Sequence, residues 1–151
     1  GKCVKISTKG RYGVSAIYDL ALHYGKGPIA VKTIAERQSI SEHYLEQLMR
    51  YLRGAGFVTS TRGAFGGYVL AKPPAEISVG EVIRVMEGEF APVECLKEGW
   101  EADKNNCNGT CGCITRGVWE KVRDSVALVL YAISFQDLCD EKLPIFHITK
   151  E

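Results

Sequence analysis

The chain has 151 residues and a formal net charge of +1 at pH 7. This length suits one domain with its own core, and the absence of a signal-peptide pattern and of any run of eighteen apolar residues argues against secretion and membrane spanning. Residues 1–72 carry eleven Lys or Arg against four Asp or Glu, which is +7, and residues 73–151 carry eight against fourteen, which is −6. We therefore expect a cytoplasmic protein whose basic half binds a polyanion, most simply nucleic acid.

The basic half predicts three helices in chain order. Residues 8–24 have apolar side chains at the spacing of one helix face. After the turn "GKGP", a short helix with Ile34 and Ala35 inward is followed by a break at residues 39–41. A longer helix then has four apolar residues on one face, namely Leu45, Leu48, Met49 and Leu52. This order predicts a helix-turn-helix motif, with Ser41 favoured over Ser39 as the N-cap of its second helix.

The second helix of such a motif enters the major groove of DNA, so its outward polar residues are candidates for reading bases. Gln47 suits a bidentate contact with adenine, Arg50 suits guanine or phosphate, and Glu46 suits the amino group of cytosine. The whole outward set comprises Glu42, His43, Tyr44, Glu46, Gln47 and Arg50. Lys9 and Arg11, at the start of the first helix, are candidates for contacts with the DNA backbone. The alternative is a helical hairpin with a solvated outer face.

A β-hairpin is predicted directly after these helices. Residues 57–61 and 68–71 are rich in β-forming residues, and a glycine-rich tip that contains Arg62 joins them. A basic hairpin after a helix-turn-helix motif is typical of a winged helix. Arg62 is then a candidate for insertion into the minor groove or for a phosphate contact.

The acidic half predicts two helices separated by a long loop. Ser78 and Glu81 have capping-box spacing before a short helix that ends at Gly88. Residues 89–112 have no helical or strand period, and helical periodicity resumes over residues 114–133. The segment "VALVLYAI" in that helix is apolar on nearly every side, which predicts that a second copy of the chain covers it in a homodimer. Ser134 and Asp137 predict a capped final helix.

The expected architecture is mainly α with a small β wing. It consists of a winged helix-turn-helix DNA-binding region over residues 1–75, a short helix and cysteine-rich loop over residues 76–112, and a dimerisation helix with a C-terminal helix over residues 113–151.

Four of the six cysteines gather in or beside the loop, at Cys95, Cys107, Cys111 and Cys113. In a reducing cytosol such a cluster is more typical of metal ligands or redox thiols than of disulfides. Zinc with all four thiolates is one alternative, although the spacing lacks a C-x-x-C pair, and a metal-free thiol regulator is another. We do not expect this protein to be an enzyme. The histidines at 23, 43 and 147 do not form a pattern in which a histidine base could activate a nucleophile, and the sequence has no phosphate-binding loop.

Three segments resemble a known family: "ISTKGRYGVSAIYDLA", "SISEHYLEQLMRYLRGAGFVTSTRGAFGGYVLAK" and "CITRGVWEKVRDSV". They are similar to the bacterial winged-helix regulators typified by IscR, NsrR and CymR, and most of all to the IscR type. The resemblance implies a dimeric, cytoplasmic transcription factor with an iron–sulfur cluster, of [2Fe-2S] type, on Cys95, Cys107 and Cys113, which regulates cluster biogenesis genes. It also implies that the DNA-reading positions are Ser41, His43, Tyr44, Glu46, Gln47 and Arg62.

The chain departs from this family at the fourth cluster ligand. IscR-like proteins have a histidine three residues after the last cysteine, where this chain has Arg116, and arginine has no lone pair to donate. NsrR-like members use an acidic residue of the partner's first helix, but the matching position here is Arg11. Cys111 is the remaining local candidate, and an external thiol, an acidic residue of the loop or an unusual donor are the others.

Overall fold

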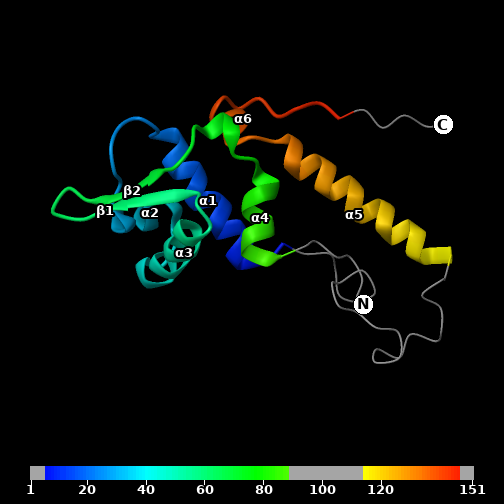
Figure 1. Ribbon diagram of the computed structural model, residues 1–151, viewed down its shortest axis with the longest axis horizontal. Helices are drawn as coiled ribbons and strands as arrows, with labels where there is room; N and C mark the ends of the chain where they lie inside the picture. Colours follow the sequence, from blue (N-terminus) through cyan, green and yellow to red (C-terminus); the bar gives the residue numbers. More distant parts are fainter. Residues whose placement is uncertain (1–5, 89–113, 147–151) are drawn as a thin grey trace.

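Helices form most of the part of the chain that the computed structural model describes, residues 6–88 and 114–146 (Figure 1). The first unit contains α1 (Thr8–Leu22), α2 (Val31–Gln38), α3 (Glu42–Gly54), β1 (Val58–Thr61) and β2 (Gly67–Leu70). The 3-10 helix η1 (Pro74–Glu76) leads to α4 (Val79–Glu87), and the chain continues with α5 (Ile114–Ala132) and α6 (Phe135–Cys139). The prediction of a mainly helical fold with a β wing is confirmed.

Helix α1 is the centre of the packing. It begins after Ser7, whose hydroxyl accepts a hydrogen bond of 3.1 Å from the Gly10 amide, and thus caps the first turn. Its Ala16, Ile17 and Leu20 are buried, and α1 contacts α2, α3, α4 and α6. The winged-helix core therefore forms around one apolar helix face, as the sequence pattern predicts.

The break between α2 and α3 takes the form of a tight helix-turn-helix turn. Ser39 adopts the left-handed conformation with φ of 56° and ends α2. Ser41 is the N-cap of α3, since its hydroxyl accepts from the Tyr44 amide at 3.1 Å, so the preference for Ser41 over Ser39 is confirmed. The buried residues of α3 are the four that its periodicity indicates, Leu45, Leu48, Met49 and Leu52.

Strands β1 and β2 form an antiparallel hairpin in which Val58 pairs with Leu70 and Thr61 with Gly67. A third backbone segment supports it, because the Tyr68 amide donates to the Ile29 carbonyl at 2.8 Å and the Ile29 amide donates back at 3.0 Å. Gly67 lies so close to Ile29 that a Cβ atom would collide with the Ile29 carbonyl, and its φ is 155°. The wing is thus fixed to the segment that joins α1 and α2.

The second half of the described chain is fastened to the first by main-chain hydrogen bonds. The Val79 amide donates to the Ile133 carbonyl at 2.8 Å, and the Phe135 amide donates to the Ile77 carbonyl at 3.0 Å. Both expected capping boxes, at Ser78 and at Ser134, are present. Helix η1 was not anticipated. Residues 89–113, which hold the expected cysteine loop, lie outside the described residues.

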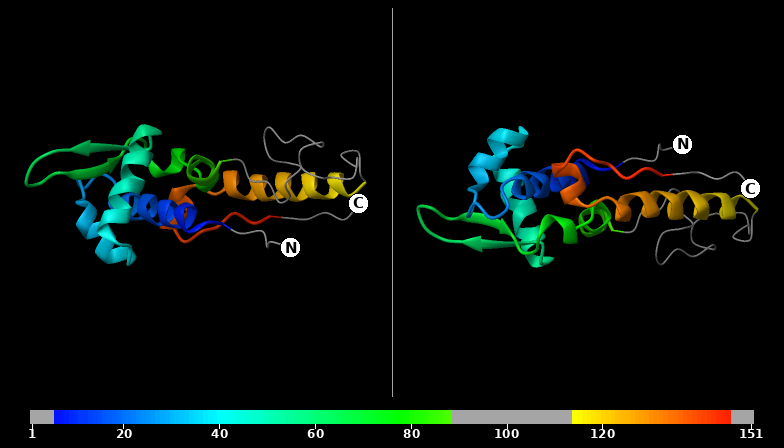
Figure 2. Two further views of the ribbon diagram at one scale, coloured as in Figure 1. Left: turned by 90° about the horizontal axis from the view of Figure 1, so that it is seen from below. Right: turned by 90° about the horizontal axis from the view of Figure 1, so that it is seen from above.

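The C-terminal end of helix α5 lies beside α6, on the body of the molecule. The N-terminal end of α5 projects away from that body (Figures 1 and 2). The hairpin and helices α2 and α3 occupy the opposite end of the long axis. None of the described helices is both long and apolar enough to cross a membrane.

Candidate nucleic-acid interface

The outer face of α3 carries exposed polar side chains that no core contact occupies. His43, Gln47 and Arg50 are all exposed, and the Gln47 amide nitrogen lies 3.2 Å from Nε2 of His43. These two predicted base-reading residues therefore form one hydrogen-bonded pair along the helix, one turn apart. A ligand that bonds to either side chain has to break the hydrogen bond between Gln47 and His43. Breaking it costs little free energy, because the pair is exposed to water.

Two further predicted positions on α3 are partly buried. Glu46 is half-buried, and Tyr44 packs edge-on against Tyr12 of α1, with ring centroids 5.8 Å apart and planes at 76°. Tyr44 therefore lies at the edge of the exposed face, where it helps hold α3 on α1. Ser41 remains exposed at the N-terminus of α3 while its hydroxyl serves as the cap.

The start of α1 brings positive charge to the same helix. The Lys9 ammonium lies 4.0 Å from the centre of the Tyr51 ring, a cation–π contact between α1 and α3. Arg11, two residues after Lys9 and therefore on a different side of α1, is exposed. Lys9 is thus held against α3 by the face of the Tyr51 ring, which places its positive charge beside this helix.

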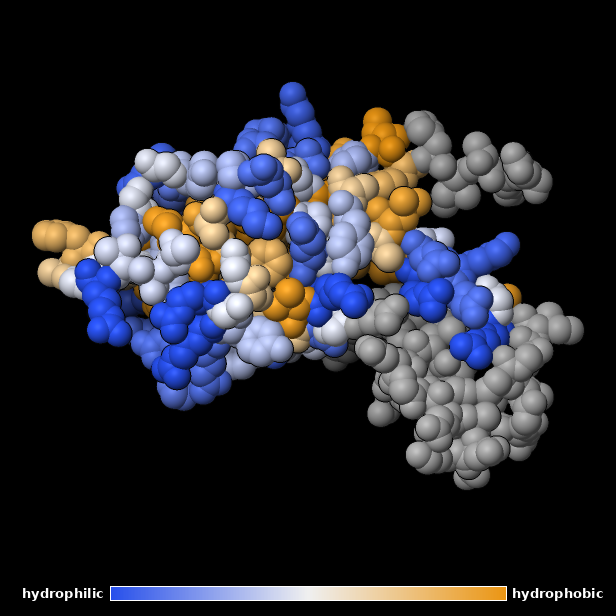
Figure 3. Space-filling view, in the orientation of Figure 1, coloured by the Kyte–Doolittle hydropathy of each residue, from blue (hydrophilic) through white to orange (hydrophobic). Residues whose placement is uncertain are grey.

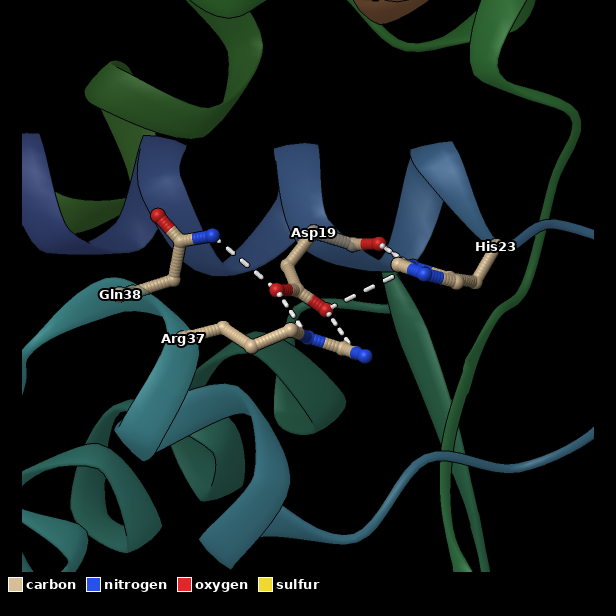
Figure 4. Close-up of polar contacts among 4 residues, drawn as sticks. All are labelled: Asp19, His23, Arg37 and Gln38. Atoms are coloured by element: carbon tan, nitrogen blue, oxygen red, sulfur yellow. Dashed lines mark hydrogen bonds and ion pairs between the residues drawn. The ribbon is translucent and has the colours of Figure 1, made fainter.

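Helix α2 is held in place by a buried carboxylate of α1 (Figure 4). Arg37 donates two hydrogen bonds to Asp19, from Nη2 to Oδ1 at 2.6 Å and from Nε to Oδ2 at 3.0 Å. Gln38 Nε2 donates to the same Oδ2 at 3.0 Å, and His23 Nδ1 lies 2.8 Å from the Asp19 carbonyl oxygen. His23 is half-buried and belongs to this cluster, which orients the helix-turn-helix motif.

The wing presents Arg62 at the point where β1 ends, and its side chain is exposed. The C-terminal end of α3 is tied to β1, because Nη1 of Arg53 donates to the Ser60 hydroxyl at 3.2 Å. Arg53 and Tyr51 are not among the residues predicted from the sequence to contact DNA. Arg53 follows Arg50 by three residues, so helical spacing offered a signal for it, whereas the contact of Tyr51 with Lys9 depends on how α1 crosses α3.

The predicted metal ligands Cys95, Cys107, Cys111 and Cys113 lie outside the described residues. The neighbouring Arg116, in the first turn of α5, is described, and its Nε lies 3.2 Å from Oε1 of Glu120. Arg116 thus takes part in an ion pair within its own helix. Within residues 6–88 and 114–146, no group of three His, Cys, Asp or Glu side chains is placed to hold a metal ion.

Cys139 in α6 is half-buried among the residues that pack on the core. Burial raises the pKa of its thiol, and the nearby Asp140 carboxylate raises it further. Because the thiolate is the reactive form, this cysteine is poorly suited to redox chemistry.

The family model of Rrf2, described as "Iron-dependent Transcriptional regulator", matches residues 6–141. The chain belongs to the Rrf2 family. Among Rrf2 relatives, the HTH-type transcriptional regulator CymR of Bacillus subtilis is 45% identical over 135 residues, which is 89% of each chain. The HTH-type transcriptional regulator IscR of Aliivibrio salmonicida is 40% identical over 135 residues, 89% of this chain and 77% of the relative.

Solved Rrf2 structures have the same fold. The structure of B. subtilis CymR, called there the global cysteine regulator, superposes with a TM-score of 0.74 over 91% of this chain and 98% of that one. The structure of T. potens IscR gives 0.72 at 47% identity, over 91% of this chain and 87% of the other. The protein is therefore an Rrf2-family transcriptional regulator and not an enzyme, as the sequence predicts.

Proposed function

We propose that this protein is a homodimeric, DNA-binding regulator that senses iron–sulfur cluster status and controls genes of cluster biogenesis or related processes. The observation that carries the DNA-binding part is the pairing of an exposed polar face on α3 with an exposed Arg62 on the wing, at one end of the molecule. In this proposal α3 enters the major groove, where Gln47 and Arg50 contact bases or phosphates, and Arg62 contacts the adjoining minor groove.

Helix α5 supplies the argument for a dimer. Five of its large apolar side chains are exposed in the single chain, namely Val118, Trp119, Leu128, Val129 and Tyr131. A shallow apolar groove on the helix is lined by Ser125, Val126, Val129 and Leu130. A second copy packed along this helix removes the apolar surface from water and gives two recognition helices for two half-sites about 34 Å apart.

The proposed cluster ligands are Cys95, Cys107 and Cys113. Cysteine thiolates are the preferred ligands of iron–sulfur clusters, and the description of the Rrf2 model as iron-dependent supports this assignment. When bound, such a cluster supplies a group that gains or loses an electron and is lost on oxidation. Arg116 is paired with Glu120 and has no lone pair to donate, which leaves Cys111 as the local candidate for a fourth ligand.

A physical route from the cysteine segment to α3 is available. The segment follows α4, whose last residue, Glu87, accepts a hydrogen bond at its Oε1 from the Ser7 amide at the start of α1. Two residues further on, Lys9 contacts Tyr51 of α3. A shift of α4 when the cysteines gain or lose a ligand would therefore move the first turn of α1 and, through it, α3. This is coupling between two sites, and it requires that cluster-loaded and cluster-free protein differ in DNA affinity.

Anaerobic purification followed by a visible absorption spectrum and iron and sulfide analysis tests the cluster. We expect a coloured protein that contains iron and sulfide and that bleaches in the Cys107→Ala variant. The Cys139→Ala variant is the matched control and should keep its colour, since Cys139 lies on the core side of α6. The Cys111→Ala variant should shift the spectrum if Cys111 is the fourth ligand. A colourless protein with stoichiometric zinc would disprove the iron–sulfur proposal.

The second candidate function is a metal-free, thiol-based or sulfur-status regulator of the CymR kind. The observation that favours it is the 45% identity to a protein whose structure is described as a global cysteine regulator. This candidate predicts that DNA affinity responds to thiol oxidation or to a partner protein in a preparation free of iron and zinc. Equal DNA affinity of the cluster-loaded and cluster-free protein would contradict cluster sensing, and an iron-free protein whose DNA affinity changes on thiol oxidation would support this second candidate.

A further inference from the structure

The tip of the wing carries a phenylalanine that takes no part in the fold. Phe65 is 94% exposed, the largest exposed fraction of any large hydrophobic side chain in the described residues. Burial of a phenylalanine side chain normally stabilises the folded protein strongly, because it removes a large apolar surface from water. The exposed Phe65 side chain adds no such stability to the fold. By contrast, Phe57 and Phe135 are both buried in the core.

The wing holds Phe65 on a well-supported base. Four residue pairs connect β1 and β2, and the Gly66 amide donates to the Gly63 carbonyl at 3.0 Å, which closes the loop around Phe65. A Cβ atom at Gly66 would collide with the Thr61 carbonyl, so the tip is tightly turned. The strands of the hairpin are bonded to Ile29 through Tyr68 and to Arg53 of α3 through Ser60, next to the last pair before the tip. The position of Phe65 relative to α3 is thus fixed by hydrogen bonds rather than by a loose loop.

The surroundings of Phe65 are apolar and cationic. Between Phe57 and Ala71 the one charged residue is Arg62, three positions before Phe65. In the space-filling view, hydrophobic residues form the outermost end of the wing and strongly hydrophilic ones lie directly beneath it (Figure 3). The wing also reaches beyond α2 and α3 along the long axis (Figures 1 and 2). An apolar tip beside a cation fits a partner that combines negative charge with an apolar interior.

We infer that Phe65 is an apolar wedge that enters the minor groove of DNA and packs against a base step next to the segment that α3 reads. The inference rests on the proposed DNA-binding function. Phosphates line both edges of the minor groove and suit Arg62, while stacked bases and sugar carbons suit an aromatic ring. Insertion of apolar side chains between base steps is an established way in which proteins unstack and bend a duplex.

DNA is favoured over a membrane or a protein as the partner by the arrangement of the rest of the interface. The residue that anchors β1, Arg53, belongs to the same helix as Gln47 and Arg50, so a ligand that occupies the outer face of α3 lies beside the wing. A single phenylalanine with a single arginine gives too little area for stable membrane or protein binding on its own. As an addition to an existing DNA interface, the same two side chains are sufficient.

The experiment begins with an operator selected from random duplexes by the full-length wild-type protein. Affinity for that operator is then measured by fluorescence anisotropy at several salt concentrations for wild type, Phe65→Ala and Arg62→Ala. Ile145→Ala is the matched control, because Ile145 is 82% exposed but lies outside the wing, near the C-terminus. Thermal unfolding of each variant establishes that the fold is intact, as expected for exposed positions.

We expect Phe65→Ala to weaken operator binding by at least about fivefold, the lower end for loss of one base–aromatic contact, with the salt dependence unchanged. Arg62→Ala should instead lower the slope of log affinity against log salt by roughly 0.9, as expected for loss of one phosphate contact. A 2-aminopurine placed at each flanking step should brighten at one step when wild type binds and stay dim with Phe65→Ala, because only the wedge unstacks it.

Unchanged operator affinity of Phe65→Ala would overturn the wedge while the proposed function stands. A loss of binding to anionic vesicles, or a change of oligomeric state, with operator affinity intact would assign Phe65 to another partner and also overturn it. Failure of the wild-type protein to select any duplex would instead contradict the proposed DNA-binding function itself.

Discussion

Asp19 is the one fully buried charged side chain of the described residues, and its role is to hold two helices together. A carboxylate without partners would be expensive to bury, but Asp19 accepts three hydrogen bonds, two from Arg37 and one from Gln38. The bidentate geometry of Arg37 also fixes the direction of α2 relative to α1. The orientation of the helix-turn-helix motif thus depends on one carboxylate of a helix that is otherwise apolar on that side.

Asp19→Asn removes the negative charge and at least one of these hydrogen bonds. Because the Arg37 side chain is 38% exposed and can turn toward water, we expect a loss of about 1–3 kcal/mol in the free energy of unfolding, below the cost of breaking a fully buried pair. Urea denaturation at pH 7 measures this change in the free energy of unfolding. Glu36→Gln, an exposed change next to Arg37 in α2, is the control and should stay within about 0.5 kcal/mol of wild type. Equal stability of both variants would show that the Asp19 cluster is energetically neutral.

At the scale of elements, the wing depends on one glycine. Gly67 begins β2 at the place where the backbone passes the Ile29 carbonyl, and a side chain there would meet main-chain atoms that cannot rotate away. The sequence pattern indicates the hairpin and its glycine-rich tip. It does not indicate the contact with Ile29, because that contact joins segments almost forty residues apart.

Gly67→Ala is expected to destabilise the protein by about 1–3 kcal/mol and to weaken DNA binding, since the wing has to move away from the α1–α2 connection. Gly54→Ala is the matched control, because Gly54 lies in α3 with no atom within 4 Å of a new Cβ. That change should leave stability equal or raise it by up to about 1 kcal/mol. Thermal or urea unfolding together with operator binding measures both variants. A Gly67→Ala protein with wild-type stability would contradict the need for close approach at this position.

The whole molecule separates its two proposed tasks along its long axis. The α3 face and the wing lie at one end, and the free part of α5 extends toward the other. The contact between α1 and α4 links them, because Gly13 of α1 lies against Met86 and the Ser7 amide bonds to Glu87. The three-part division of the chain at residues 75 and 112 stays a prediction, although the packing of α4 on α1 joins the first two parts closely.

A charged residue in the apolar groove of α5 should separate the proposed dimer. Val129→Glu places a carboxylate in the surface that a second copy would cover, and desolvation of that charge opposes association. We expect a shift from dimer to monomer in sedimentation or light scattering at micromolar concentration, together with a large loss of operator affinity. Lys142→Glu, an exposed change outside α5, is the control and should remain dimeric. A dimeric Val129→Glu protein would place the interface elsewhere.

Local periodicity and capping signals were enough to predict most of the helices and the hairpin. The apolar faces of α1 and α3, the Ser41 cap, the capping boxes at Ser78 and Ser134 and the hairpin all rest on residues within a few positions of one another, and all are present. The candidate DNA-reading residues were selected in the same way, as the side chains left outside once the core face is assigned. Features that depend on the spacing of neighbouring residues can therefore be predicted from a single sequence.

Contacts between side chains that are distant in the sequence could not be predicted in this way. The pairing of Asp19 with Arg37, the contact of Lys9 with Tyr51 and the bond of Glu87 to Ser7 join residues 18, 42 and 80 positions apart, and each depends on how helices cross. The exposure of Phe65 belongs to the same class, because a phenylalanine in a glycine-rich turn is buried or free according to what packs beside it. Helix crossing and hairpin placement result from the packing of the whole core, and no local pattern encodes them.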